Sequence, residues 1–165
     1  MNEPAVYPGG YIFIPLDLFA SANDEAEFAG MVSQAMARGL RQGATGPMFY
    51  GSLNNLPIRI PAGPRDSIRA WELQADADAA PAMARAGFDP TALLRYIERT
   101  QTKPENAAVG AFSTLPPRDE RIAALQGLLR NLPPTSSPSS EAFTSIQEQA
   151  RAQRAGDPRP TLARP

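Results

Sequence analysis

The chain has 165 residues, of which 42% are hydrophobic, and this is enough for one compact domain with a core. Its 16 Lys and Arg residues nearly balance its 17 Asp and Glu residues, so the net charge of -1 argues against a nucleic-acid partner. It has no cysteine and no histidine, which excludes disulfides, thiol nucleophiles and the commonest metal ligand and general base. No apolar run approaches the roughly 20 residues of a membrane span, so we expect none.

The N-terminal part predicts a short strand followed by a helix. A Pro-Gly-Gly turn precedes an aromatic and β-branched run at residues 11–14, which is typical of a strand near a sheet edge. Asn23 is the predicted N-cap of a helix that ends near Gly43. Apolar residues recur in this helix at helical spacing and predict one buried stripe: Phe28, Met31, Val32, Ala35, Met36, Gly39 and Leu40.

Residues 43–64 are rich in Gly, Pro and Asn and predict an irregular connection, with one short extended candidate at residues 57–60. A second helix is predicted from about Asp66 to Ala86, with Gly87 as its C-terminal stop. We expect Pro81 to kink this helix or divide it. Its predicted buried face consists of Ile68, Trp71, Ala75, Ala79, Ala82 and Met83.

Two further helices follow. Asp89 and Pro90 open the first of them, whose apolar residues are Leu93, Leu94, Tyr96 and Ile97. The next spans residues 118–130, with Ile122, Leu125, Leu128 and Leu129 expected in the core. After residue 132 the composition changes to Pro, Ser, Thr, Ala and Arg, and only residues 142–152 have helical potential. The sequence therefore predicts a domain at residues 1–132 and a tail at residues 133–165, with a predominantly helical α+β fold.

Polar residues on the first two long helices are the candidates for a site. Gln34 and Arg38 lie four residues apart and project from one face, where a solvated flank is the ordinary interpretation. Glu72 falls within the apolar stripe of the second helix, where an unpaired carboxylate is costly. Asp76 lies one turn further on, at the edge of the same face. The two carboxylates could form a site or could reach solvent at the rim of the core.

Three segments together resemble a known family. They are "VYPGGYIFIPLDLFASANDEAEFAGM" with the helix after it, "WELQADADAAPAMARAGFDP" and "FSTLPPRDERIAAL". In this order they resemble the gluzincin zinc metallopeptidases of the HtpX and CAAX-prenyl-endopeptidase type. The resemblance covers most of residues 6–132 and implies a zincin-like domain with a small sheet packed on the active-site helices.

The resemblance also implies where the zinc chemistry would lie on the first helix. The two histidines of the family's H-E-x-x-H motif correspond to Gln34 and Arg38, and its catalytic glutamate corresponds to Ala35. That motif needs two imidazoles on adjacent turns to hold zinc and a glutamate to accept a proton from the bound water. Both histidines and the glutamate are replaced in this sequence.

The rest of the implied site lies further along the chain. The third zinc ligand of the family corresponds to Glu72, and the supporting acid of the same motif corresponds to Asp76. A histidine that precedes a proline in the family corresponds to Leu115. The resemblance therefore implies that one metal ligand of three is retained, at Glu72.

Our leading hypothesis is a pseudopeptidase domain that keeps the fold without zinc-dependent hydrolysis and needs no cofactor. We predict that Arg38 points toward Glu72 and supplies the positive charge that zinc would have given. Such a domain could still bind an extended peptide or protein segment beside the predicted strand, which consists of Tyr11, Ile12, Phe13 and Ile14.

Two alternatives remain open. The chain could be an active metalloendopeptidase with an atypical site, in which Glu72, Asp76 and Asp78 hold a hard cation through oxygen ligands. It could instead be a structural interaction domain that uses its Pro-rich tail. The resemblance implies a membrane-associated or extracytoplasmic location, because relatives of this type are often found there.

Overall fold

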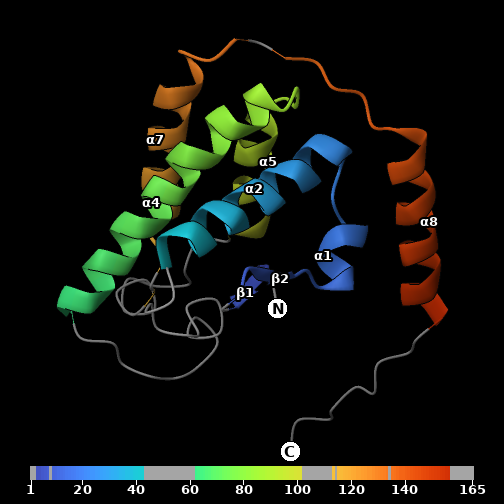
Figure 1. The fold of residues 1–165 in the computed structure, drawn as a ribbon, viewed down its shortest axis with the longest axis horizontal. Coiled ribbons are helices and arrows are strands. Elements are labelled where there is room, and N and C mark those ends of the chain that lie inside the picture. Colours follow the sequence, from blue (N-terminus) through green and yellow to red (C-terminus); the bar gives the residue numbers. More distant parts are fainter. Residues whose placement is uncertain are drawn as a thin grey trace, which may run out of the picture.

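The computed structural model describes residues 3–7, 9–42, 62–101, 113, 115–133 and 135–156. The fold is α+β and predominantly helical, as predicted, with one small sheet (Figure 1). In chain order its elements are β1 (Ala5–Tyr7), β2 (Tyr11–Phe13), α1 (Leu16–Ala20), α2 (Glu25–Gln42), α4 (Ala62–Arg85), α5 (Thr91–Thr100), α7 (Arg118–Leu129) and α8 (Glu141–Gly156). The predicted extended segment at residues 57–60 lies outside the described residues.

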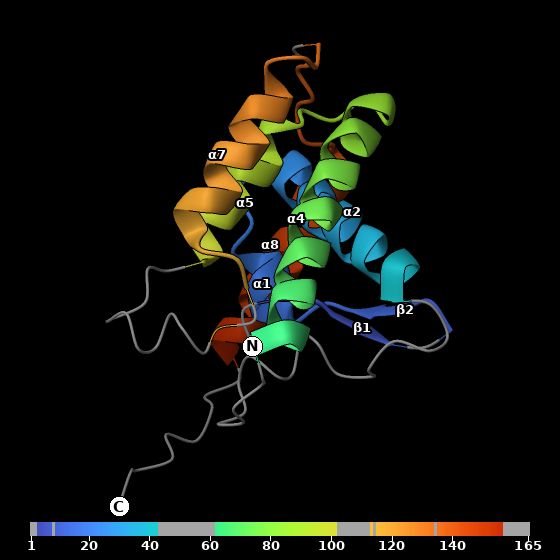
Figure 2. The same ribbon diagram turned by 90° about the vertical axis from the view of Figure 1, so that its left-hand side faces the viewer.

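The two strands form an antiparallel hairpin beside the C-terminal half of α2 (Figure 2). Gly9 and Gly10 have φ angles of 89° and 83°, which an L side chain rarely adopts, so the predicted turn forms there. The predicted strand is confirmed as β2, whereas β1 is too short for its alternation to be recognised. A Cβ atom on Gly39 would lie 2.9 Å from Cγ1 of Val6, which shows how closely β1 approaches α2.

Helix α2 begins with a different cap from the predicted one. The Oδ1 atom of Asp24 accepts a hydrogen bond from the backbone N–H of Glu27 at 2.7 Å, so Asp24 is the N-cap. The side chain of Asn23 instead donates to Oε2 of Glu27 at 2.6 Å. The prediction of Asn23 as the cap is therefore wrong, because the carboxylate of Glu27 turns back toward Asn23.

Helix α4 starts earlier than predicted and continues through Pro81 to Arg85. The expected division at Pro81 does not occur, although the proline removes one backbone donor. Packing explains this, because the turn around the proline buries Ala79, Ala80 and Met83 in the core. These contacts hold the last turn of the helix in place.

The C-terminal end of α4 is the predicted one. Gly87 has a φ angle of 84°, and the N–H of Phe88 donates to the carbonyl of Met83 at 3.0 Å. The N–H of Gly87 donates to the carbonyl of Ala84 at 3.1 Å. This pair of hydrogen bonds is the Schellman motif, which satisfies carbonyl groups left without partners at a helix end.

The core lies among α2, α4, α5 and α7, which cross one another in Figures 1 and 2. Its fully buried large side chains include Met31, Met83, Leu93 and Ile97. Helices α5 and α7 form where they were predicted, and of the four α7 leucine and isoleucine positions Leu125 is fully buried. Among the described residues, none of the helices is both long and apolar enough to span a membrane.

The predicted stripes are partly wrong. Met36, Leu40 and Trp71 are 53%, 84% and 42% exposed. The buried face of α2 is rotated toward the side that carries Gln34 and Arg38, so two polar residues take the place of two apolar ones. Periodicity did not reveal this rotation, because apolar residues occur on both sides of α2.

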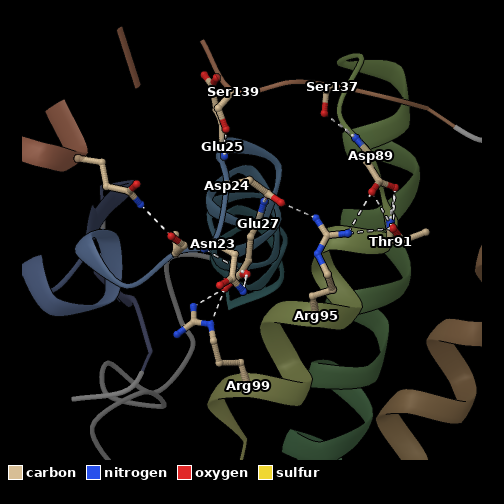
Figure 3. Close-up of polar contacts among 12 residues, drawn as sticks. Asn23, Asp24, Glu25, Glu27, Asp89, Thr91, Arg95, Arg99, Ser137 and Ser139 are labelled. Carbon is tan, nitrogen blue, oxygen red and sulfur yellow. Dashed lines mark hydrogen bonds and ion pairs between the residues drawn. The ribbon is translucent and has the colours of Figure 1, made fainter. Parts of the chain in front are cut away.

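The N-terminal end of α2 is held by ion pairs from α5 (Figure 3). Arg99 donates from both Nε and Nη2 to Oε1 of Glu27, whose side chain is fully buried. Arg95 forms ion pairs with Asp24 at 2.8 Å and with Asp89 at 3.1 Å. These pairs tie the start of α2 to α5 and so fix the angle at which α2 crosses the core.

The C-terminal segment packs on the N-terminal elements, and Figure 1 shows α8 standing beside α1. The ring of Phe143 contacts the rings of Phe19 and Phe28 at centroid distances of 5.6 and 5.8 Å. Gln147 donates to the carbonyl of Ala22 at 2.8 Å. The predicted helix at residues 142–152 is confirmed, and α8 extends beyond this range at both ends. Helix α1 was not predicted. The domain boundary after residue 132 stays a prediction.

Candidate functional site

Gln34 and Arg38 on α2 face Glu72 on α4 within the protein. Their exposed fractions are 3%, 5% and 4%. The Nε2 atom of Gln34 donates to Oε2 of Glu72 at 2.9 Å, and Nη1 of Arg38 lies 3.7 Å from Oε1 of Glu72. The predicted approach of Arg38 to Glu72 is confirmed as an ion pair, and the solvated-flank interpretation of Gln34 and Arg38 is wrong.

Arg38 also holds the segment that precedes β1. Its Nη1 atom donates to Oε2 of Glu3 at 3.2 Å, and its Nη2 atom donates to the carbonyl of Pro4 at 3.1 Å. Pro4 is fully buried. Glu3 was not among the predicted site residues, because no pattern in the sequence indicates that its side chain would reach α2.

Burial and charge act in opposite directions on this cluster. Burial raises the pKa of Glu72, and the positive charge of Arg38 only partly offsets the effect. Burial by itself would lower the pKa of Arg38, but the carboxylates of Glu72 and Glu3 outweigh it and raise that pKa. Arg38 therefore carries its charge at any ordinary pH, while Glu72 holds a proton more readily than a solvated glutamate does.

Asp76 forms a second buried pair one turn along α4. Its two carboxylate oxygens accept hydrogen bonds from Nε and Nη2 of Arg121, each at 2.7 Å. Nη1 of Arg121 also donates to Oε1 of Gln101 at 2.9 Å. Asp76 and Arg121 are 3% and 4% exposed, so of the two alternatives left open for Asp76, the one in which it reaches solvent is wrong. Arg121 was not predicted as a site residue. It lies four residues before Leu125 and therefore on the core face of α7.

The two remaining positions of the implied site carry no polar side chain. Ala35 is fully buried on α2. Leu115 is half-buried, and its backbone N–H donates to Oγ of Ser113 at 3.1 Å. Arg69 donates from Nη2 to the carbonyl of Ser113 at 2.8 Å and so holds this segment against α4. Neither Ala35 nor Leu115 can donate or accept a proton in a reaction.

The predicted peptide-binding strand lies on the outside of the hairpin. Tyr11 and Phe13 are 67% and 62% exposed, whereas Ile12 and Ile14 are half-buried. Ile14 packs against the core. Within the part of the chain that the structure describes, β2 pairs with β1 alone, which leaves its other edge unpaired.

The geometry thus brings together, between α2 and α4, the three residues that the resemblance aligns with zinc ligands. The model of Peptidase family M48 matches residues 14–129, which is more than half of the chain. The chain belongs to peptidase family M48. No match was found among curated proteins. The family that the three sequence segments resembled is confirmed.

The residues of this M48 domain do not fit the zinc ion that its family implies. A guanidinium group has no lone pair to offer a metal, and Arg38 directs its positive charge at Glu72. One oxygen of Glu72 already accepts the amide donor of Gln34. The sequence has neither histidine nor cysteine that could replace these groups.

The structure also bears on the alternative cation site of the M48 domain. Glu72 and Asp76 are each paired with an arginine, and Asp78 is exposed and accepts a hydrogen bond from Gln74. Among the described residues, no three acidic, histidine or cysteine side chains lie close enough together to hold a metal ion. The three carboxylates therefore do not converge on one point.

Proposed function

We propose that this M48 domain is a pseudopeptidase, which keeps the family fold without zinc-dependent proteolysis. The observation that carries the proposal is the buried cluster of Gln34, Arg38 and Glu72. In it a positively charged side chain lies against the retained carboxylate, where the family has a metal ion. We propose that the domain needs no metal cofactor, because Arg38 balances the charge of Glu72.

The experiment compares the natural chain with the triple variant Gln34→His, Ala35→Glu and Arg38→His. We expect the natural chain to contain no stoichiometric zinc by elemental analysis and to cleave no unfolded protein substrate such as reduced casein. Zinc bound by the variant would show that the scaffold can still present the three ligand positions. Stoichiometric zinc together with chelator-sensitive cleavage by the natural chain would contradict the proposal.

We further propose that the domain binds an extended peptide along the edge of β2 that faces away from β1. The observation in favour is that Tyr11 and Phe13 are exposed on a strand with one partner among the described residues. Added strands gain main-chain hydrogen bonds, and exposed aromatic rings offer contacts to alternate side chains of the peptide. The two rings are exposed, whereas Gln34, Arg38 and Glu72 are buried, so peptide binding here would not depend on catalysis.

Amide chemical shifts test the peptide proposal. A set of peptides with alternating apolar and polar residues should shift the amide signals of β2, and Tyr11→Ser with Phe13→Ser should weaken that binding. Met36→Ser with Leu40→Ser is the control, because these residues are exposed on α2. Binding that shifts other amides, or that survives the β2 variant unchanged, would overturn this assignment.

A further inference from the structure

Arg38 has an unusual set of partners for a buried guanidinium. Glu72 approaches it from α4, while Glu3 and the carbonyl of Pro4 approach it from the segment before β1. The Nε atom of Arg38 is buried and has no hydrogen-bond partner among the residues that the structure describes. One donor of the guanidinium fork is therefore unused, although a carboxylate can accept from two donors of that fork at once.

The two carboxylates around Arg38 differ in how firmly they are held. The side chain of Glu72 is 5% exposed. Glu72 lies on the long helix α4, and its carboxylate accepts a hydrogen bond from Gln34. Glu3 is 22% exposed at its side chain, lies outside any helix or strand, and contacts Arg38 through one oxygen at 3.2 Å. The side chain of Glu3 can therefore turn into water while Glu72 stays in place.

Two opposing electrostatic effects act on Glu3, because Arg38 attracts its carboxylate and Glu72 repels it. Glu3 and Glu72 both approach Nη1 of Arg38, so their negative charges repel each other. The charged groups facing the cluster are Arg38 and Arg121 on one side and Glu3, Glu72 and Asp76 on the other. Departure of Glu3 opens a position beside Arg38, and a ligand carboxylate in that position would restore the same set of charges.

We propose that Arg38 forms a carboxylate-binding site, which Glu3 occupies in this structure and which accepts the carboxylate of another molecule when Glu3 leaves. The ligand is a small organic acid or the carboxylate of a peptide, and both would use the same guanidinium donors. The inference deepens the proposed function and rests on it, because the site must be free of zinc. Glu3 is tethered to the site, so it competes at a high effective concentration and weakens binding of a free ligand.

The test uses the full chain and its Glu3→Ala and Glu3→Gln variants, the second of which preserves the size of the side chain. Sodium acetate is titrated against sodium chloride at equal ionic strength, while the Nε–Hε signal of Arg38 is followed by NMR. We expect a saturable, acetate-specific shift in both variants, with binding at least about tenfold weaker in the natural chain. The further substitution Arg38→Lys in the Glu3→Ala background removes the Nε–Hε signal, so binding is followed there by the side-chain amide signal of Gln34, which lies in the same cluster. Acetate binding should be weaker, because lysine lacks the fork.

Asp119→Ala is the matched control, since it removes an exposed carboxylate that lies 3.6 Å from Arg118. Acetate should bind this variant as weakly as it binds the natural chain, because Glu3 still occupies the position beside Arg38. A second titration compares an acetylated tripeptide that ends in a free carboxylate with the same tripeptide amide. Tighter binding of the free acid than of acetate indicates a peptide ligand, and equal binding indicates a small organic acid.

Two failures can be told apart. A zinc-free chain whose Glu3 variants show no acetate-specific shift at Arg38 would overturn this inference and leave the pseudopeptidase proposal in place. Stoichiometric zinc in the natural chain, or an acetate response abolished by a chelator, would overturn the proposed function itself. A response in Asp119→Ala as large as that of the Glu3 variants would also overturn the inference, because it would show nonspecific anion binding.

Discussion

At the scale of single residues, each buried charged side chain among the described residues has a partner of opposite charge. Arg38 meets Glu72, Arg121 meets Asp76, and Arg99 meets Glu27. Removing one partner of a buried pair leaves an uncompensated charge, which costs more than the pair itself contributes. These residues therefore specify how the helices fit together more than they add to stability.

Arg121→Met tests this at the pair with the best geometry. We expect the free energy of unfolding in urea to fall by about 3–5 kcal/mol, because the buried carboxylate of Asp76 loses its compensating partner. The double variant Asp76→Leu and Arg121→Met should recover most of that loss. Arg130→Met, at an exposed position just after α7, is the control and should change stability by less than about 0.5 kcal/mol. A similar small change in Arg121→Met would contradict the argument.

At the scale of elements, close approach of helices places a limit on side-chain size. A Cβ atom on Gly30 of α2 would lie 3.1 Å from Cα and 3.2 Å from N of Leu93 on α5. These are backbone atoms, so they cannot move aside without a shift of α5. Gly127 on α7 has open space where its Cβ would be. The two glycines thus share a helical setting and differ in their surroundings.

Gly30→Ala and Gly127→Ala are a matched pair of variants. Alanine favours the helix by up to about 1 kcal/mol at either position. Overpacking against Leu93 should exceed this gain at Gly30 and give a net destabilisation on the order of 1 kcal/mol. Chemical denaturation of both variants measures the difference. A Gly30→Ala protein as stable as Gly127→Ala would show that α2 and α5 are further apart than the structure places them.

At the scale of the whole molecule, the C-terminal segment connects parts that are distant in sequence. Ser139 accepts a hydrogen bond from the N–H of Glu25, and the N–H of Ser140 donates back to the Glu25 carboxylate, at 2.9 and 2.6 Å. Helix α8 then donates to carbonyls at the end of α1 through Gln147 and Arg151. A helix as short as α1 is marginally stable by itself. Helix α8 therefore stabilises α1 by supplying hydrogen-bond donors to its C-terminal end.

Phe143→Ala should detach this segment, because the ring is 8% exposed among Phe19 and Phe28. Its loss should cost about 3 kcal/mol of docking free energy. We expect hydrogen exchange to become faster in α8 and in α1 while the core helices stay protected. Ile146→Ala on the same helix is the control, since Ile146 is 56% exposed. Equal exchange rates in the two variants would refute the role of Phe143.

Helix positions and their stop signals could be predicted from the sequence because they depend on local chemistry. Gly87 ends α4 because it adopts a positive φ angle, and Asp89 with Pro90 opens α5. The choice between Asn23 and Asp24 as the cap could not be predicted, because it depends on where the Glu27 carboxylate turns. Nor could the exposure of Met36 and Leu40, because the rotation of α2 is set by its neighbours.

The sequence by itself determined the family, the helical α+β class and the placement of Glu72 on a core face, because motif order and periodicity are local properties. It also determined that the chain has no H-E-x-x-H motif, since it contains no histidine. Only the tertiary structure decided that Glu3 shares Arg38 with Glu72 and that Asp76 pairs with Arg121. Those contacts join residues that are 35 and 45 positions apart, and packing of the helices and the hairpin brings them together.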